Sequence, residues 1–331
     1  MEVTIKDIAK VAGVSKSTVS RVLSNSGKFS EESKQKVLEA AKKLNYTKNA
    51  VARAMITKET KNIGLIVYQK HKPILSHPFY APVIESIVDN SMKLGYSIII
   101  ATDQDIKGSS AELLLEKRVD GIIFASFIDP SIVLKYKEQN IPLVLVNNSV
   151  DFKGVSYIKF DNFKGAFEAV SYLISKKHKN IGLLSGPLEH QSYKERLRGY
   201  MSALKENGLI AKEKNIRVGN STLSEGFRLM KELLNESILP TAVFASNDMM
   251  AIGAIKAIKS FNLRVPEDIA VIGFDNIDYG RLIEPSLSTI DADKDRMGKK
   301  AVELLIKEIN KYHSFRRENI LPTKLVIRKS T

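Results

Sequence analysis

The sequence predicts an α/β protein that begins with a small all-helical unit and continues as two α/β subdomains of similar plan. Residues 1–60 show helical periodicity throughout, whereas short apolar runs alternate with amphipathic helical stretches in the rest of the chain. The pentapeptide KNIGL occurs at 61–65 and again at 179–183, and a similar order of elements follows each copy. Apolar strands separated by helices are typical of parallel sheets covered on both faces.

Length and composition set the outer limits. A chain of 331 residues is long enough for two or three domains, and 44% hydrophobic with 27% charged residues is typical of a soluble globular protein. The absence of cysteine excludes a disulfide framework and thiolate chemistry, and it indicates a reducing cytosol. The first ten residues lack the apolar core of a signal peptide, and no stretch approaches ~18 apolar residues. We therefore expect a cytoplasmic protein without a membrane partner.

The charge of the chain is uneven. Its net charge is +14, and the first sixty residues hold twelve Lys and Arg against six Asp and Glu, a net of +6. A basic segment of this kind favours a polyanionic partner such as nucleic acid. The shift in charge and pattern places a domain boundary near residues 57–61.

Residues 4–46 read as three short helices. Thr4, Ser15 and Ser30 are suited to cap them, and Gly13 supplies a tight turn between the first two. The inward positions form apolar stripes: Ile5, Ile8 and Ala9; Val19, Val22 and Leu23; Val37, Leu38, Ala41 and Leu44. Two helices joined by such a turn make a helix-turn-helix, whose second helix enters the major groove of DNA. A three-helix bundle that packs on another part of the protein is the alternative.

The second of these helices carries polar residues on its outward face. Lys16, Ser17, Ser20 and Arg21 point away from the predicted core. Hydroxyls and helix N-terminal amides suit phosphate oxygens, and Lys or Arg can reach guanine edges. The pattern thus predicts a DNA-reading helix.

The N-terminal segment VTIKDIAKVAGVSKSTVSRVLSNSGKFSEESKQKVLEAAKKLNY resembles the headpiece of the lactose-repressor (LacI/GalR) family of bacterial transcription regulators. The segment NAVARAMITKETKNIGLI resembles the hinge of that family, and LPTKLVIRKST is similar to its closing strand. The resemblance therefore covers essentially the whole chain. It implies a helix-turn-helix headpiece with a hinge helix over residues 1–57, followed by a two-lobed, periplasmic-binding-protein-like domain over residues 61–331.

The resemblance implies that residues 49–56 form a hinge helix only on DNA, paired with the copy from a second subunit. An apolar side chain from each copy then wedges into the minor groove. Met55 stands where the family usually has leucine, and an ordinary linker residue is the alternative reading. The expected DNA-binding residues are Thr4, Ser15, Lys16, Ser17, Thr18, Ser20, Arg21, Asn49, Ala52 and Met55.

In the second domain we expect an N-subdomain of 61–159 plus 291–319 and a C-subdomain of 160–290 plus 320–331. Ligands bind at the carboxyl ends of parallel strands, so the two sheets can line a shared cleft. The expected effector-binding residues near those ends are Phe79, Tyr80, Phe160, Arg196, Asn247 and Asp275.

These residue types suit a polyhydroxylated ligand, since carboxylate, amide and guanidinium groups make paired hydrogen bonds and rings stack on sugar faces. By resemblance Arg196, Asn247 and Asp275 match family positions that contact the effector, whereas Phe79 and Phe160 can equally belong to the core. We interpret Asp248 as a helix N-cap. Ser221 stands where the family often has an aromatic ring, so either the ligand differs or another ring takes over.

Enzyme motifs are absent from the sequence. There is no G-x-S-x-G, G-x-x-x-x-G-K-[ST] or G-x-G-x-x-G pattern, and the five histidines show no metal-binding spacing. We therefore expect neither catalysis nor a cofactor. The alternative function is a cytosolic sugar receptor that acts through a protein partner or corepressor.

Together these patterns predict a homodimeric repressor of carbohydrate-utilisation genes. Two headpieces would read a pseudo-palindromic operator, and a sugar or sugar phosphate in the cleft would switch binding. No leucine-heptad tail follows VIRKST, which favours a dimer over a tetramer. The effector, the operator and the sign of the switch stay open, with maltose-type regulation as a guess from the resemblance.

Overall fold

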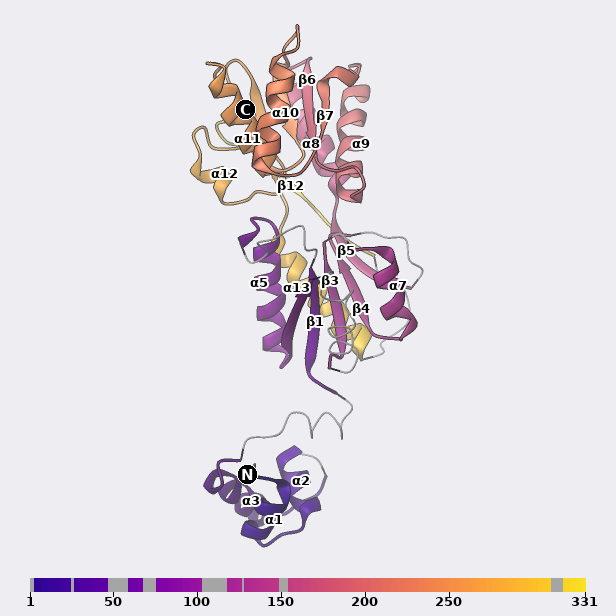
Figure 1. Ribbon diagram of the computed structural model, residues 1–331, viewed down its shortest axis with the longest axis vertical. Coiled ribbons are helices and arrows are strands. Elements are labelled where there is room, and N and C mark those ends of the chain that lie inside the picture. Colours follow the sequence, from indigo (N-terminus) through magenta and orange to yellow (C-terminus); the bar gives the residue numbers. More distant parts are fainter. Residues whose placement is uncertain are drawn as a thin grey trace. The chain divides into compact units, whose positions relative to one another are not determined.

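The structure, a computed structural model, describes residues 3–24, 27–46, 59–67, 76–102, 118–126, 128–148, 154–310 and 318–331. The chain divides into two compact units, Met1–Thr60 and Lys61–Thr331, which we treat separately (Figure 1). The predicted hinge helix lies outside the described residues.

The first unit contains α1 (Ile5–Ala12), α2 (Lys16–Ser24) and α3 (Glu31–Lys43). Gly13 ends α1 in the left-handed conformation, with φ of +66°, which a residue with a side chain adopts only at a cost. The hydroxyl oxygens of Ser15 and Ser30 accept hydrogen bonds from the backbone N–H groups of Thr18 (3.1 Å) and Ser33 (3.2 Å). These caps and the turn agree with the sequence prediction.

A small apolar core joins the three helices of this unit, with Ile8, Val19 and Val37 fully buried at its centre. One predicted core residue is wrong, because Leu38 is 50% exposed. On α3 the buried positions follow the spacing of Val37, Ala40, Ala41 and Leu44, and residue 38 lies about 100° around the helix from residue 37.

The second unit has two lobes. In the first, the all-parallel sheet has the order β11-β5-β4-β3-β1-β2. Its strands are β1 (Asn62–Val67), β2 (Ser97–Thr102), β3 (Gly121–Ala125), β4 (Leu143–Val146), β5 (Ser156–Phe160) and β11 (Glu318–Leu321). Apolar residues of α5 (Tyr80–Lys93) and α13 (Lys294–Ile309) cover one face, and those of α7 (Pro130–Glu138) cover the other.

The second lobe has a four-stranded parallel sheet of order β7-β6-β8-β9. Its strands are β6 (Ile181–Ser185), β7 (Ile216–Val218), β8 (Ala242–Ala245) and β9 (Ala270–Ile272), and the 3₁₀ turn η4 (Glu213–Asn215) precedes β7. Helices α8 (Asn162–Ser175) and α9 (Gln191–Glu206) pack on one face, and α10 (Leu223–Leu234) and α11 (Asp248–Ser260) pack on the other (Figure 1). The short helix α12 (Tyr279–Leu282) follows β9.

The two copies of the pentapeptide KNIGL have equivalent places in the two sheets. The first copy leads into β1, which lies between β2 and β3, and the second leads into β6, which lies between β7 and β8. Each copy therefore supplies an interior strand of its own parallel sheet, which confirms the predicted pair of α/β subdomains.

Three crossovers connect the lobes. The chain passes from β5 to α8, from β10 (Thr289–Asp291) to α13, and from β11 to β12 (Lys324–Val326), which pairs antiparallel with β10. Leu321 of β11 still pairs with Phe160 of β5 in the first-lobe sheet. The first lobe thus extends one residue past the expected break at 159 and two residues past that at 319.

Helix pairs of the second lobe approach closely through glycine. A Cβ atom on Gly253 of α11 would lie 2.2 Å from the carbonyl oxygen of Leu223 and 2.7 Å from the nitrogen of Phe227. Both are backbone atoms at or near the start of α10, so the two helices would have to move apart.

We expect Gly253→Ala to lower the free energy of unfolding by about 1–3 kcal/mol, although Gly to Ala normally favours a helix. Thermal unfolding of purified protein measures this. Lys256→Ala, at an exposed position of the same helix, is the matched control and should leave stability nearly unchanged. Wild-type stability of the Gly253→Ala variant would contradict the close approach.

None of the described helices is both long and apolar enough to cross a membrane.

Candidate functional site

The exposed face of α2 carries the residues predicted to meet DNA. Lys16, Ser17 and Arg21 are exposed, while Thr18 and Ser20 are half-buried. The Ser15 hydroxyl lies 2.7 Å from that of Ser17 and 2.9 Å from that of Thr18. This places a cluster of hydroxyls and the first backbone N–H groups of α2 together, which is the local chemistry that binds phosphate.

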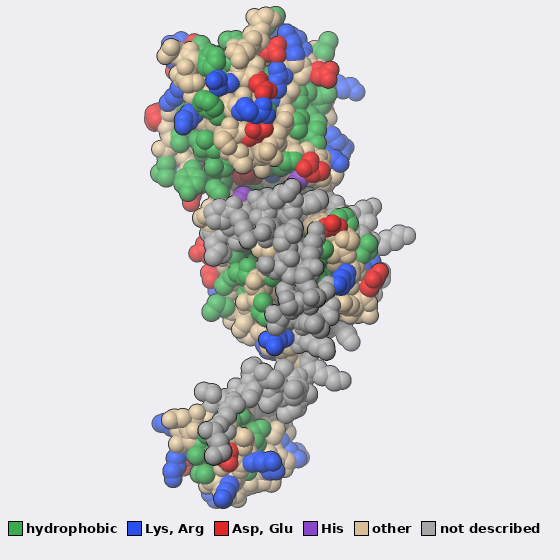
Figure 2. All heavy atoms as spheres, viewed as in Figure 1, with side chains coloured by type: hydrophobic (Ala, Val, Ile, Leu, Met, Phe, Trp, Pro, Cys, Tyr) green, Lys and Arg blue, Asp and Glu red, His purple; other side chains and the backbone are tan. Residues whose placement is uncertain are grey.

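The headpiece carries further positive charge on its surface. Lysines 6, 10, 28, 42 and 43 of the headpiece are also exposed, and Figure 2 shows Lys and Arg side chains around the visible side of the unit. Thr4 is exposed and takes part in the start of α1, since its N–H (2.9 Å) and its hydroxyl (2.7 Å) both donate to the Asp7 carboxylate. Asn49, Ala52 and Met55 lie outside the described residues, so their expected role stays a prediction.

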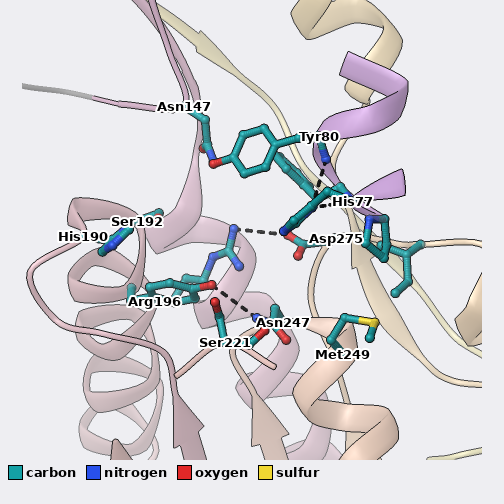
Figure 3. Close-up of a pocket in the computed structure, with 14 residues that line it drawn as sticks. His77, Tyr80, Asn147, His190, Ser192, Arg196, Ser221, Asn247, Met249 and Asp275 are labelled. Atoms are coloured by element: carbon teal, nitrogen blue, oxygen red, sulfur yellow. Dashed lines mark hydrogen bonds and ion pairs between the residues drawn. The ribbon is translucent and has the colours of Figure 1, made fainter. Parts of the chain in front are cut away.

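A cavity in the second unit collects residues from both lobes (Figure 3). Five of the six residues predicted to bind an effector line it: Phe79, Tyr80, Arg196, Asn247 and Asp275. It is also lined by His77, Pro78, Asn147, His190, Ser192, Tyr193, Ser221, Met249 and Ile277. Tyr80 and Asn147 belong to the first lobe, whereas Arg196, Asn247 and Asp275 belong to the second. A ligand in this cavity would therefore touch both lobes.

Phe160 is the exception. Its side chain is fully buried in the first-lobe core, where its ring stands edge-on to that of Phe79 with centroids 6.3 Å apart. As the last residue of β5 it points into the sheet's apolar layer, so it supports the cavity wall through Phe79 and does not line the cavity itself.

On the second-lobe side of the cavity, Arg196 contacts several other side chains and one backbone carbonyl. Only 3% of its surface is exposed, and its guanidinium carbon lies 3.6 Å from the centroid of the Phe274 ring. Its Nε donates to Asn162 Oδ1 (2.9 Å), its Nη1 donates to the Ser246 carbonyl, and its Nη2 lies 3.3 Å from Asp275 Oδ1. A guanidinium has five N–H groups. These contacts use three of them and leave two without a partner among the described residues.

Asp275 faces Arg196 from the loop after β9. It is 7% exposed, and its backbone has φ of +113°, a strained conformation for a residue with a side chain. Burial raises the pKa of its carboxyl, and the positive charges of Arg196 and Lys294 act in the opposite direction. Within the described part of the chain its Oδ1 makes the ion pair but accepts no hydrogen bond of good geometry, so it can accept one from a ligand.

Asn247 serves two purposes at once. Its Oδ1 accepts from the Met250 N–H (2.8 Å) and so caps α11, while its Nδ2 donates to the Tyr193 hydroxyl (3.2 Å) and the Ser221 carbonyl (3.1 Å). Tyr193 therefore stands beside Ser221 with its ring in the cavity wall. An aromatic ring thus lies in the cavity wall next to position 221, although residue 221 itself is a serine.

The first-lobe side of the cavity is largely neutral. Burial lowers the pKa of His77 to about 4, and its Nδ1 accepts from the backbone N–H groups of Phe79 (3.2 Å) and Tyr80 (3.3 Å). Burial raises the pKa of Tyr80 to about 12, and its hydroxyl accepts from Asn147 Nδ2 (3.1 Å). Asn147 Oδ1 is buried and has no hydrogen-bond partner in the described structure, which leaves a second acceptor beside the cavity.

Sequence reasoning missed His77, Asn147 and Tyr193 as cavity residues. Asn147 directly follows the buried strand β4, and that position was the available signal. No pattern in the sequence marks His77, which lies just before α5, or Tyr193, which lies in the first turn of α9. No cluster of three or more His, Asp or Glu among the described residues could hold a metal.

Asp248 is not the N-cap that the sequence indicated, since Asn247 caps α11. The Asp248 side chain is fully buried and accepts from the Thr289 hydroxyl (2.6 Å) and the Ile277 N–H (2.8 Å). It thereby ties α11 to β10 and to the loop that carries Asp275. Burial, together with the charge of Asp275, raises the pKa of Asp248 to about 8.

This raised pKa predicts a pH dependence. An unfolded aspartate titrates near about 3.9, so between pH 5 and 8 the folded protein holds a proton that the unfolded chain releases. Stability should therefore fall as pH rises, by about 1.4 kcal/mol per pH unit from this group. Denaturant unfolding at several pH values should show a flatter slope for Asp248→Asn than for wild type. Asp89→Asn, at an exposed position, should keep the wild-type slope, and equal slopes for all three proteins would refute the raised pKa.

Both parts of the chain match known protein families. Residues 4–49 match the model of bacterial regulatory proteins of the lacI family, and residues 170–331 match that of a periplasmic binding protein-like domain. The chain is 38% identical over 333 residues to the HTH-type transcriptional repressor PurR of Pasteurella multocida, with 99% of this chain and 98% of that protein covered. The chain belongs to the LacI family. It is a DNA-binding transcriptional repressor of that family, which confirms the resemblance and the function class that the sequence indicated.

Other known proteins are similar to this chain over its full length. The probable HTH-type transcriptional repressor ExuR of Bacillus subtilis is 36% identical over 330 residues, covering 99% of this chain and 98% of that protein. The Lac repressor dimer bound to operator and the anti-inducer ONPF superposes with a TM-score of 0.87 at 30% identity, covering 100% of this chain and 99% of that one. A complex of the transcriptional regulator CelR with cellobiose gives a TM-score of 0.77 at 28% identity, with 100% of both chains covered.

Proposed function

We propose that this LacI-family repressor binds a pseudo-palindromic operator as a homodimer and that a sugar or sugar phosphate in the interlobe cavity switches its affinity for DNA. Its targets would be carbohydrate-utilisation genes, and its place of action the bacterial cytoplasm. The full-length likeness to a Lac repressor dimer on operator DNA supports the dimer and the operator. A two-fold protein requires a two-fold site, with one headpiece on each half.

The observation that carries the effector proposal is the buried Arg196–Asp275 pair, which faces the cavity opposite Tyr80 and Asn147. The two guanidinium N–H groups without a partner, and the Asp275 and Asn147 Oδ1 atoms that accept no hydrogen bond, can bind hydroxyl groups that both donate and accept. Aromatic rings of Phe79 and Tyr193 give the apolar faces of a sugar a surface to contact. The likeness to a CelR–cellobiose complex supports the same class of ligand.

The switch follows from where the ligand lies. A ligand that contacts both lobes binds one relative arrangement of them better than another, and it shifts the equilibrium by that difference in affinity. We propose that this arrangement decides whether the two hinge segments can meet on DNA.

Three experiments test the proposal. DNase footprinting on DNA upstream of the protein's own gene should show a protected site with two-fold symmetry, and sedimentation should show a dimer. Thermal unfolding with a panel of neutral sugars and sugar phosphates should single out a compound that raises the melting temperature. If no sugar binds but a cytosolic protein alters the footprint, the chain acts with a corepressor and the sugar proposal is wrong.

A further inference from the structure

A buried ion pair crosses between the lobes next to the effector cavity. Lys159 lies on β5 of the first lobe and Glu195 lies on α9 of the second, and Nζ is 2.5 Å from Oε1. Their side chains are 16% and 10% exposed. They border a separate small pocket at the crossover, together with Asp161, Phe163 and Arg198.

The pair is connected to Arg196 by hydrogen bonds. Asn162, the first residue of α8, is 1% exposed and lies between the two. Its Nδ2 lies 3.4 Å from Glu195 Oε2 and also donates to the Phe160 carbonyl (3.1 Å), while its Oδ1 accepts from Arg196 Nε (2.9 Å). Asn162 thus accepts a hydrogen bond from Arg196 with its amide oxygen and donates one to the Glu195 carboxylate with its amide nitrogen.

A buried ion pair is a weak source of stability, because removing both charges from water offsets most of their attraction. Removing one partner is different, since it leaves the other charge buried and uncompensated. Without Lys159, the Glu195 carboxylate would gain by turning toward water through the crossover pocket. Asn162 Nδ2 would then keep only the Phe160 carbonyl as an acceptor, and the amide that orients Arg196 Nε would be held less firmly.

We propose that Glu195 and its ion-pair partner Lys159, which lies on the opposite lobe, are positioning residues that hold Arg196 in the orientation that meets the effector. Neither residue lines the cavity, so they act through Asn162. The inference rests on the proposed function in taking Arg196 as a ligand-binding residue. It also implies that the orientation of Arg196 depends on the arrangement of the two lobes, because β5 belongs to the first lobe and α9 to the second.

The test reads Arg196 directly in ligand-free, full-length protein. The Nε–H signal of Arg196 in ¹⁵N spectra is assigned by its loss in Arg196→Lys, and its rate of exchange with solvent reports the bond to Asn162. We expect Lys159→Met to speed this exchange about tenfold or more, in the range of energetic coupling between neighbouring sites. Lys159→Arg, which keeps the charge, should restore the wild-type rate.

Two further variants separate positioning from general stability. In Lys159→Met/Glu195→Gln, the glutamine carries no charge and can still accept from Asn162, so exchange should return toward wild type. Lys164→Met breaks the exposed Lys164–Glu168 pair on α8 and should leave the Arg196 exchange rate unchanged. The backbone amide of Ala203, in the second-lobe core, should exchange at the wild-type rate in every variant.

Unchanged Arg196 exchange in Lys159→Met would overturn the inference, and so would equal acceleration at Arg196 and Ala203. A second readout is the affinity for cellobiose, measured by calorimetry, which should weaken about tenfold in Lys159→Met and recover in Lys159→Arg. If wild type binds neither cellobiose nor any sugar of the panel, the proposed effector class fails, while the exchange measurement still decides whether the pair positions Arg196.

Discussion

Arg196→Ala is expected to abolish the response to the effector while leaving operator affinity of the ligand-free protein within about threefold of wild type. The side chain contacts Asn162, Ser246, Asp275 and the Phe274 ring, and it lines the cavity. The residues expected to touch DNA belong to the other compact unit. Operator binding followed by fluorescence anisotropy, with and without the sugar, measures both quantities.

A control must separate lost recognition from lost folding. Alanine at position 196 leaves the buried Asp275 carboxylate without its counter-charge, and breaking such a pair costs about 3–5 kcal/mol. Arg196→Met combined with Asp275→Asn removes both charges and should be more stable than the single variant. We expect the double variant to fold, to bind operator and to ignore the sugar. An intact ligand response in either variant would contradict the assigned role of Arg196.

Met55→Gly is expected to weaken operator binding on the order of a hundredfold, while binding to bulk DNA falls by less than about threefold. Met55 lies outside the described residues, so this prediction rests on the sequence and on the family resemblance. An apolar side chain that wedges between base pairs contributes only where DNA is bent at a specific site, whereas bulk DNA is held by charge.

Met55→Leu is the matched variant, because it keeps an apolar wedge and matches the residue that relatives usually carry. It should bind operator at least as well as wild type. Both DNAs must be titrated at the same salt concentration, since counterion release changes all affinities together. Equal losses on operator and bulk DNA in Met55→Gly would rule out the wedge.

Much of the fold was predictable because its signals are local. Helix caps such as Ser15 and Ser30, the left-handed Gly13, and the apolar runs of β1 and β6 are all set by neighbouring residues. The errors arose where packing between elements decides. Leu38 is apolar but lies off the buried face of α3, and Phe160 ends a strand whose last side chain faces the core.

The residues of the candidate site also differ in how far the sequence could predict them. Asn247 and Asp275 follow strands at the sheet edge where parallel strands bind ligands, so position along the chain pointed to the cavity that they line. Arg196 lies in the second turn of α9, and the family resemblance was the signal for it. Asp248 was assigned the cap that its neighbour Asn247 makes, because one residue of offset decides which side chain turns inward. Asn162, which links Lys159 and Glu195 to Arg196, was visible only once both lobes were in place.

The most direct measurement is operator binding titrated at fixed salt against neutral sugars and sugar phosphates, using DNA from upstream of the protein's own gene and, as competitor, DNA of unrelated sequence. We expect one class of sugar to change operator affinity at least tenfold in wild type and to have no effect in Arg196→Ala. Operator affinity that no sugar changes, or that equals the affinity for unrelated DNA, would contradict a sugar-switched repressor.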